Sequence, residues 1–85
     1  MGKEISIRLK FFSGIDKELK LLDYDPSRGI SMSIPAGKRL KFALKSAGMT
    51  SFSGYALFRS GERISTWTKL KDGDEVSCLK PSGGG

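Results

Sequence analysis

The sequence predicts an α+β fold in which one helix packs on one face of a mixed sheet of four to five strands. Residues 4–11 and 30–34 alternate between apolar and polar side chains, a pattern typical of half-buried strands. Residues 38–47 have a helical period instead, and short β-rich segments follow them. The chain has 85 residues, which is enough for one domain whose small core a single sheet and a single helix can enclose.

The first strand is expected over residues 4–11, where every second side chain is large and apolar. These side chains are Ile5, Ile7, Leu9 and Phe11. Residues 13–16 are interpreted as the turn that follows, and residues 19–21 as a further extended segment. Residues 23–29 are rich in Asp, Pro and Gly and predict a loop, after which residues 30–34 form the second strand.

A helix is expected over residues 38–47, where the apolar side chains have the i, i+3, i+4, i+7 spacing of one helical face. They are Leu40, Ala43, Leu44 and Ala47. Gly48 is the expected stop and Gly37 the expected N-cap. Lys38 and Arg39 in the first turn oppose the helix dipole. Such a basic turn fits either a solvated helix face, which we favour, or a surface that binds a partner.

The second half of the chain is expected to add two or three short strands. Residues 55–58 are apolar, residues 60–61 are a Ser-Gly pair typical of a hairpin turn, and residues 63–68 are rich in β-branched side chains. The Asp-Gly-Asp sequence at 72–74 predicts a tight turn, since glycine tolerates positive φ. A last strand through residues 76–78 follows this turn.

Residues 1–80 are assigned to the folded domain and residues 81–85 to a flexible, Gly-rich C-terminal tail that offers no large apolar side chain. The chain contains no apolar run long enough for a transmembrane helix. Its N-terminal alternation also lacks the continuous apolar stretch of a secretory signal. We therefore expect a cytoplasmic protein with no membrane partner.

The composition excludes several kinds of active site. The chain has no histidine and one cysteine, Cys78. It therefore cannot form a disulfide within itself, a zinc-finger or iron–sulfur ligand set, or a nucleophile–histidine pair. We expect a carrier or binding module that is not itself an enzyme and holds no metal. The formal net charge of +6 indicates either an acidic partner or simply solubility.

The C-terminal residues carry a resemblance to a known family. Residues 70–76 read Leu-Lys-Asp-Gly-Asp-Glu-Val, a last strand follows, and the chain then has Pro81 and ends in Gly84-Gly85. Together with the order of the expected elements and the opening Ile-Arg-Leu-Lys-Phe-Phe at 7–12, this pattern resembles the ThiS/MoaD sulfur carriers. These are the ubiquitin-like β-grasp proteins of thiamine and molybdopterin synthesis.

The resemblance implies a function for the tail. The carboxylate of Gly85, next to Gly84, would be adenylated by a partner enzyme of the ubiquitin-activating type, which uses ATP, and converted to a thiocarboxylate. The thiocarboxylate would then donate sulfur to a cofactor precursor of the molybdopterin, tungsten-cofactor or thiamine type on an acceptor subunit. Gly83 and Pro81 would contact the partner, because a tail without side chains can enter a narrow channel. The carrier itself would bind no cofactor.

Several single residues allow two interpretations. Cys78 is expected in the core, the alternative being a relay thiol near the tail. Trp67 and Tyr55 are expected to cap the core, the alternative being a platform for stacking bases. Phe12, Phe52 and Phe58 are too many large rings for so small a core, so an apolar docking patch is expected to include Phe12 or Phe58. Four cationic residues form either a solvated face, which we favour, or a basic sheet face: Arg8, Lys10, Arg59 and Arg63.

Four functions are therefore compared. The leading hypothesis is the sulfur carrier. The second is a ubiquitin-like protein modifier that forms an isopeptide through the same carboxylate. The third is a basic nucleic-acid-binding β module, which the charge favours but which lacks interleaved basic and aromatic residues. The fourth is a domain whose glycine tail remains from cloning.

Overall fold

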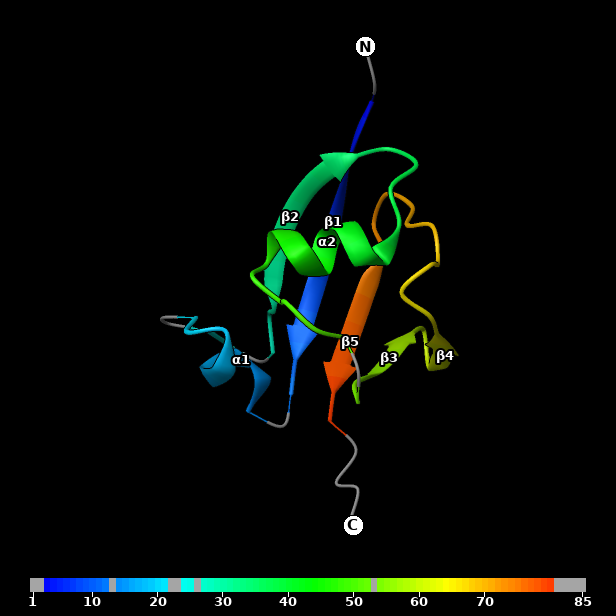
Figure 1. Cartoon of the computed structure of the whole chain (residues 1–85). Helices are drawn as coiled ribbons and strands as arrows, with labels where there is room; N and C mark the ends of the chain where they lie inside the picture. The colour runs from blue at the N-terminus through cyan, green and yellow to red at the C-terminus, as the bar shows by residue number, and fades with distance from the viewer. Residues whose placement is uncertain (1–2, 13, 22–23, 26, 53, 81–85) are drawn as a thin grey trace.

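The computed structural model describes residues 3–12, 14–21, 24–25, 27–52 and 54–80. Its elements are β1 (Glu4–Phe11), α1 (Ile15–Glu18), β2 (Ile30–Pro35), α2 (Leu40–Ser46), β3 (Ala56–Arg59), β4 (Glu62–Ile64) and β5 (Glu75–Leu79). The strands form one sheet in the order β2-β1-β5-β3-β4, and α2 crosses one face of it (Figure 1). β1 and β5 are parallel while the other neighbours are antiparallel, so the sheet is mixed. The predicted fold class is thereby confirmed.

The alternation of the strands decides which face of the sheet is buried. Ile7, Leu9 and Phe11 of β1 are at most 3% exposed, and Val76 and Cys78 of β5 are fully buried. In register, Leu9 lies beside Val76 and Phe11 beside Cys78, so all of these side chains enter the same layer. The period of two read from the sequence therefore identifies the inner face of the sheet.

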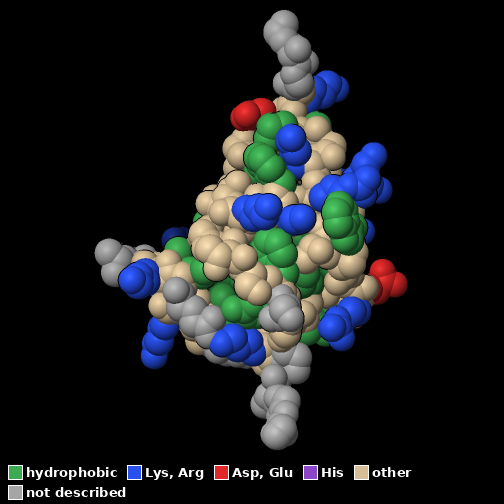
Figure 2. All heavy atoms as spheres, viewed as in Figure 1, with side chains coloured by type: hydrophobic (Ala, Val, Ile, Leu, Met, Phe, Trp, Pro, Cys, Tyr) green, Lys and Arg blue, Asp and Glu red, His purple; other side chains and the backbone are tan. Residues whose placement is uncertain are grey.

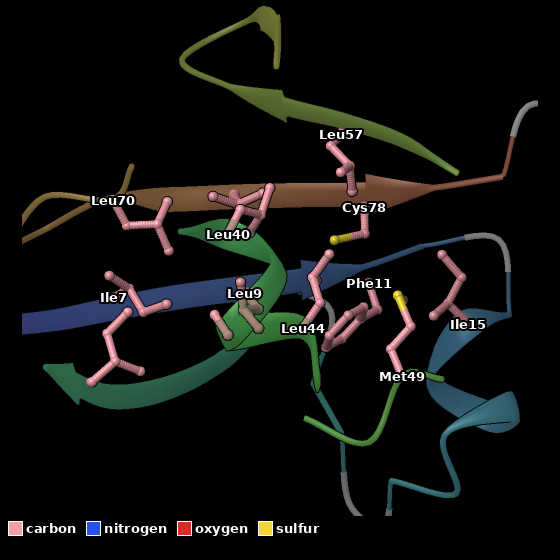
Figure 3. Packing of buried hydrophobic residues seen from close by; sticks show 13 residues of the cluster. Ile7, Leu9, Phe11, Ile15, Leu40, Leu44, Met49, Leu57, Leu70 and Cys78 are labelled. Atoms are coloured by element: carbon pink, nitrogen blue, oxygen red, sulfur yellow. The ribbon is translucent and has the colours of Figure 1, made fainter. Parts of the chain in front are cut away.

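α2 covers the core with the apolar face that the helical spacing of the sequence predicted. Leu40, Ala43 and Leu44 are fully buried. Figure 3 shows Leu40 and Leu44 over the side chains of β1 and β5, with Met49 and Ile15 at the end of the cluster. Such apolar burial stabilises the fold by about 25 cal/mol for each Å² removed from water.

The start of α2 differs from the prediction, because the N-cap is Arg39 and not Gly37. Arg39 has an extended backbone, and its side chain makes no capping hydrogen bond. The first free N–H groups of the helix, those of Leu40 and Lys41, donate instead to the carbonyl oxygens of Thr68 at 2.8 Å and Thr66 at 2.9 Å. A neighbouring loop thus replaces the side-chain cap that most helices need.

Two further segments correct the sequence interpretation. α1 occupies part of the segment predicted as a turn followed by an extended stretch, because Ile15 inserts fully into the core and draws one helical turn with it. The strand expected over residues 63–68 ends at Ile64. The Ser65 Oγ accepts a hydrogen bond from the Trp67 N–H at 3.2 Å and turns the chain away from the sheet, despite its β-branched composition.

The tail assigned to residues 81–85 lies outside the described residues. Within the described part of the chain, neither helix has the length and hydrophobicity needed to cross a lipid bilayer.

Candidate functional site

The turn at residues 72–74 fixes the position of β5, the strand that leads to the tail. Ser6 of β1 exchanges two hydrogen bonds with this turn: its N–H donates to Asp72 Oδ1 at 2.8 Å, and its carbonyl accepts from the Gly73 N–H at 2.7 Å. The Arg8 N–H donates to the carbonyl of Asp74 at 2.9 Å. Three hydrogen bonds therefore set the register in which β5 enters the sheet beside β1.

The carboxylate of Asp74 reinforces the same turn. Asp74 Oδ2 accepts a hydrogen bond from Arg59 Nη1 at 3.0 Å and another from the Lys71 N–H at 2.8 Å. The Asp74 side chain is 17% exposed and that of Arg59 is 29% exposed, so water screens this ion pair only in part. The Asp-Gly-Asp sequence, which is part of the family resemblance, thus has a structural role: its hydrogen bonds orient β5.

β5 runs parallel to its neighbour β1, so the C-terminal ends of these two strands lie at the same end of the sheet (Figure 1). The Phe12 N–H donates to the Cys78 carbonyl at 2.9 Å, and Leu79 lies opposite Ala56 of β3. Lys80, the last described residue, places its Nζ 5.9 Å from the centroid of the Tyr55 ring. The predicted tail residues Pro81, Gly83, Gly84 and Gly85 lie outside the described residues.

The two predicted docking residues lie on the chain segments that flank β5. Phe12 follows β1 directly and is 37% exposed. Phe58 of β3 lies opposite Ser77 of β5 and is half-buried. Because Ser77 alternates with the buried Val76 and Cys78, Phe58 belongs to the face of the sheet that is turned away from α2, called here the open face. The sequence could not indicate that β5 would separate the two rings.

Three of the four basic residues of the sheet share one face, and the fourth, Arg59, lies on the other face. Arg8, Lys10 and Arg63 share the open face, since their partners in register are Glu75, Ser77 and Phe58 respectively. Lys10 Nζ lies 3.5 Å from Glu75 Oε1, and the guanidinium of Arg63 lies 6.0 Å from the Phe58 ring centroid. The grouping of Arg59 with these residues was wrong, because Arg59 lies opposite Val76 on the α2 side.

Cys78 is a core side chain, as the favoured interpretation predicted. It is fully buried, and Figure 3 shows its sulfur directed into the layer near Leu44. Burial raises the pKa of the Cys78 thiol from 9.0 to about 12, because a thiolate would lose its hydration there. At neutral pH the group is therefore a protonated thiol with no access to a substrate, which opposes the relay alternative.

A hollow of about 530 Å³ lies beside the turn at 72–74. Its lining includes the hydroxyl side chains Ser6, Ser31 and Ser33 together with Arg8 and Glu75. The chain contains no histidine, so none of these serines belongs to a serine–histidine pair. Among the described residues, no three His, Cys, Asp or Glu side chains come together as metal ligands.

The interpretation of Trp67 as a cap on the core was wrong, whereas Tyr55 does pack against the core. Trp67 is 63% exposed and lies beside α2, where Phe42 is 39% exposed. Phe42 was assigned no role from the sequence, although this large apolar residue lies outside the buried helix face formed by Leu40, Ala43 and Leu44. That position off the buried face was the signal that could have identified it.

Comparison with solved structures identifies the fold. The chain resembles SAMP1 from Haloferax volcanii with a TM-score of 0.68 at 18% identity, over 94% of this chain and 99% of that one. A second structure, H. volcanii small archaeal modifier protein 1, gives a TM-score of 0.69 at 14% identity, over 91% and 98%. A Pyrococcus furiosus protein assigned as molybdopterin converting factor, subunit 1, gives 0.68 at 15% identity, over 91% and 98%.

These similarities confirm the predicted ubiquitin-like β-grasp fold and support, at the level of the fold, the resemblance to the ThiS/MoaD type. They cover nearly the whole of each chain, so the likeness extends to the complete arrangement of helix and sheet. No family model matches this chain, and no curated protein matches its sequence. With identities of 18% or less, the comparisons establish the fold and not the activity.

Proposed function

We propose that this protein is a ubiquitin-like carrier whose reactive group is the carboxylate of Gly85. The observation that carries the proposal is the placement of β5. The turn at 72–74 holds this strand between β1 and β3, and the sequence Lys-Pro-Ser-Gly-Gly-Gly follows it directly. A rigid body joined to a short glycine-ended segment is what a partner enzyme needs in order to grip the protein and reach its carboxylate.

The proposed chemistry requires no catalytic side chain from the carrier. A Gly85 carboxylate oxygen attacks the α-phosphorus of ATP on the partner, pyrophosphate leaves, and an acyl-adenylate forms. Sulfide then attacks the acyl carbon and AMP leaves, so that sulfur replaces one carboxylate oxygen and no electron is transferred. The absence of histidine and the burial of Cys78 are consistent with a protein that acts as a substrate in both steps.

The body and the tail would have separate tasks. The exposed Phe12 and the half-buried Phe58 would dock on the activating enzyme from the two sides of β5, since aromatic rings contribute strongly to protein interfaces. Residues 80–85 would extend at most about 20 Å beyond the body, enough to enter a cleft while the sheet stays outside. Because this segment consists mainly of proline, serine and glycine, its side chains are small enough for it to enter a narrow channel.

Activation can be tested apart from sulfur. The purified chain is incubated with extract of its source cells, ATP and hydroxylamine, which converts an acyl-adenylate into a stable hydroxamate. We expect a hydroxamate on Gly85, detected by peptide mass spectrometry, that requires ATP and is lost when Gly85 is deleted. Phe58→Ser should slow its formation, with circular dichroism used to verify that the variant is folded under the assay conditions. A hydroxamate that forms equally on the deleted chain would contradict the proposal.

A second candidate, a protein modifier, uses the same activated carboxylate. Two of the structural neighbours bear the name small archaeal modifier protein or its abbreviation, whereas the third is assigned to molybdopterin conversion. A modifier would transfer its acyl group to a lysine amine and release AMP. Isopeptide-linked conjugates of a tagged chain that resist reducing agents would favour this role. A thiocarboxylate passed to a separate acceptor subunit would favour the sulfur carrier in a cytoplasmic cofactor pathway.

A further inference from the structure

A second surface with its own chemistry lies on the opposite side of the molecule from the open face. It is a shallow groove of about 280 Å³ along α2, called here the α2 groove. Its lining residues are Lys38, Arg39, Lys41, Phe42, Lys45 and Trp67. Figure 2, viewed from the α2 side, shows Lys and Arg side chains gathered over this part of the surface, with the visible acidic side chains at its margins.

Two aromatic rings stay exposed among these cations. Phe42 is 39% exposed and Trp67 is 63% exposed, and they are two of the three large apolar side chains exposed in the described part of the chain. Lys38 Nζ lies 4.9 Å from the Phe42 ring centroid, and Lys41 Nζ lies 5.0 Å from the Trp67 ring centroid. Cation–π contacts at these distances hold both ammonium groups beside the groove.

The loop that carries Trp67 is fastened to the helix. Arg39 Nη1 donates to the Trp67 carbonyl at 2.7 Å, and the Lys41 N–H donates to the Thr66 carbonyl at 2.9 Å. Because these hydrogen bonds join the two walls of the groove, the backbone of the Trp67 loop loses little conformational entropy when a ligand binds. The α2 groove is therefore preorganised.

No ion pair among the described residues neutralises the positive charge of the groove. The ion pairs found among the described residues involve Arg8, Lys10 and Arg59, all outside the groove. Among the residues that the structure describes, no acidic side chain lines the groove, and none occupies the first turn of α2, where it would stabilise the helix. The sequence thus places cations where local stability favours anions, and such a charge excess complements an acidic partner.

We propose that the α2 groove is a docking site for an acidic segment of a partner protein. Carboxylates of the segment would meet Lys38, Lys41 and Lys45, while one apolar side chain of the segment would contact the edges of the Phe42 and Trp67 rings, since the ammonium groups of Lys38 and Lys41 lie over the ring faces. This interaction does not depend on Gly85 or on the proposed carrier function. Because the groove and the open face lie on opposite sides of the sheet, the protein could bind both partners at once.

Two observations favour an acidic protein over a single-stranded nucleic acid. The ammonium groups of Lys38 and Lys41 lie over the aromatic rings, so a stacking base would have to displace them from those faces. The groove also follows α2, whose seven residues span only about 10 Å, whereas nucleic-acid grooves follow the backbone over several nucleotides.

The test uses a fluorescein-labelled peptide of glutamate and aspartate with one central leucine, its glutamine/asparagine analogue as a control, and oligothymidylate. Binding to the purified chain is followed by anisotropy. Trp67, the only tryptophan in the chain, reports whether the unlabelled peptide occupies the groove. The test variant is Lys38→Glu/Lys41→Glu. The matched control is Lys17→Glu/Lys20→Glu, which lowers the net charge equally but alters exposed residues at and just after α1.

We expect the acidic peptide to shift the Trp67 emission and to bind about tenfold more weakly to Lys38→Glu/Lys41→Glu, because two attractions become repulsions. The control variant should bind nearly as well as the unmodified chain. Far-UV circular dichroism should show that the test variant keeps its helix, since position 41 lies in the first turn, where glutamate is favourable, and position 38 lies before the N-cap. Equal weakening in both variants, no binding of the acidic peptide, or a preference for oligothymidylate would each overturn the proposal.

Discussion

The carboxylate of Asp74 should contribute strongly to stability, because it closes its own turn through Lys71 and joins that turn to Arg59 of β3. It accepts one hydrogen bond from Arg59 at 3.0 Å and one from the Lys71 N–H at 2.8 Å, with its side chain only 17% exposed. Hydrogen bonds to a charged group contribute about 1.5–3 kcal/mol each, and partial exposure reduces this. Asp74→Ala should therefore lower the free energy of unfolding by about 2 kcal/mol.

Urea denaturation followed by circular dichroism measures this loss. A decrease of about 2 kcal/mol in a domain of this size corresponds to a fall in Tm of roughly 10 °C. Glu62→Ala removes a charge from an exposed position of β4 and should change stability by less than about 0.5 kcal/mol. A double-mutant cycle with Arg59→Met should give a coupling energy of about 1 kcal/mol between the two side chains.

The same variant tests the role of the turn in positioning β5. Loss of the Asp74 contact with Arg59 should let β5 separate from β3 more often, so the amides of Val76 and Cys78 should exchange with solvent faster than those of β2. If Asp74→Ala were no less stable than Glu62→Ala, or if exchange rose equally in every strand, the turn at 72–74 would not anchor β5 and the structural interpretation of the motif would be wrong.

Further predictions concern one turn, one core residue and one docking residue. Gly29→Ala should cost about 2 kcal/mol or more, because φ is +72° and the new Cβ would lie 2.5 Å from the Leu9 carbonyl oxygen. Gly37→Ala, at φ +88° with nothing within 4 Å, should cost only about 1 kcal/mol, and equal urea midpoints would refute the steric argument. The Cys78 thiol has its folded-state pKa raised from 9.0 to about 12, so below pH 9 it leaves stability unchanged. Above pH 9 the unfolded chain ionises first, and stability should fall by about 1.4 kcal/mol per pH unit. Cys78→Ala should lack this part of the alkaline loss, and parallel curves for the two proteins would contradict it. Phe58→Ser should raise the KM of the activating enzyme for the chain by about tenfold while leaving kcat nearly unchanged at a temperature where the variant stays folded, whereas an unchanged KM would remove Phe58 from the docking surface.

The sequence predicted the elements whose periodicity is long enough to be read. Eight residues of β1 alternate without interruption, and the spacing of Leu40, Ala43 and Leu44 identifies one face of α2. α1 has only four residues, too few for a helical period, and its position follows from the burial of Ile15. The segment after Ile64 has β-forming composition, yet local hydrogen bonds of Ser65 end the strand there.

Only those parts of the candidate site whose residues are close together in the sequence could be predicted. The Asp-Gly-Asp turn and the glycines after β5 are adjacent in sequence, so their association could be recognised. The face on which Arg59 lies depends on strand register, and the contact of Trp67 with α2 joins residues 28 positions apart. Such tertiary contacts leave no local pattern. The sequence indicated the cations at the start of α2 and singled out Trp67, but not the exposed ring of Phe42 between them.

The most direct test of the proposed function is intact mass spectrometry of the chain after incubation with source-cell extract, ATP and sulfide. The extract should first be shown to form the Gly85 hydroxamate, so that a competent activating enzyme is present. The account predicts a mass gain equal to the replacement of one oxygen by sulfur, dependent on ATP and absent from a chain that lacks Gly85. An unchanged mass in such an extract would contradict the sulfur-carrier function.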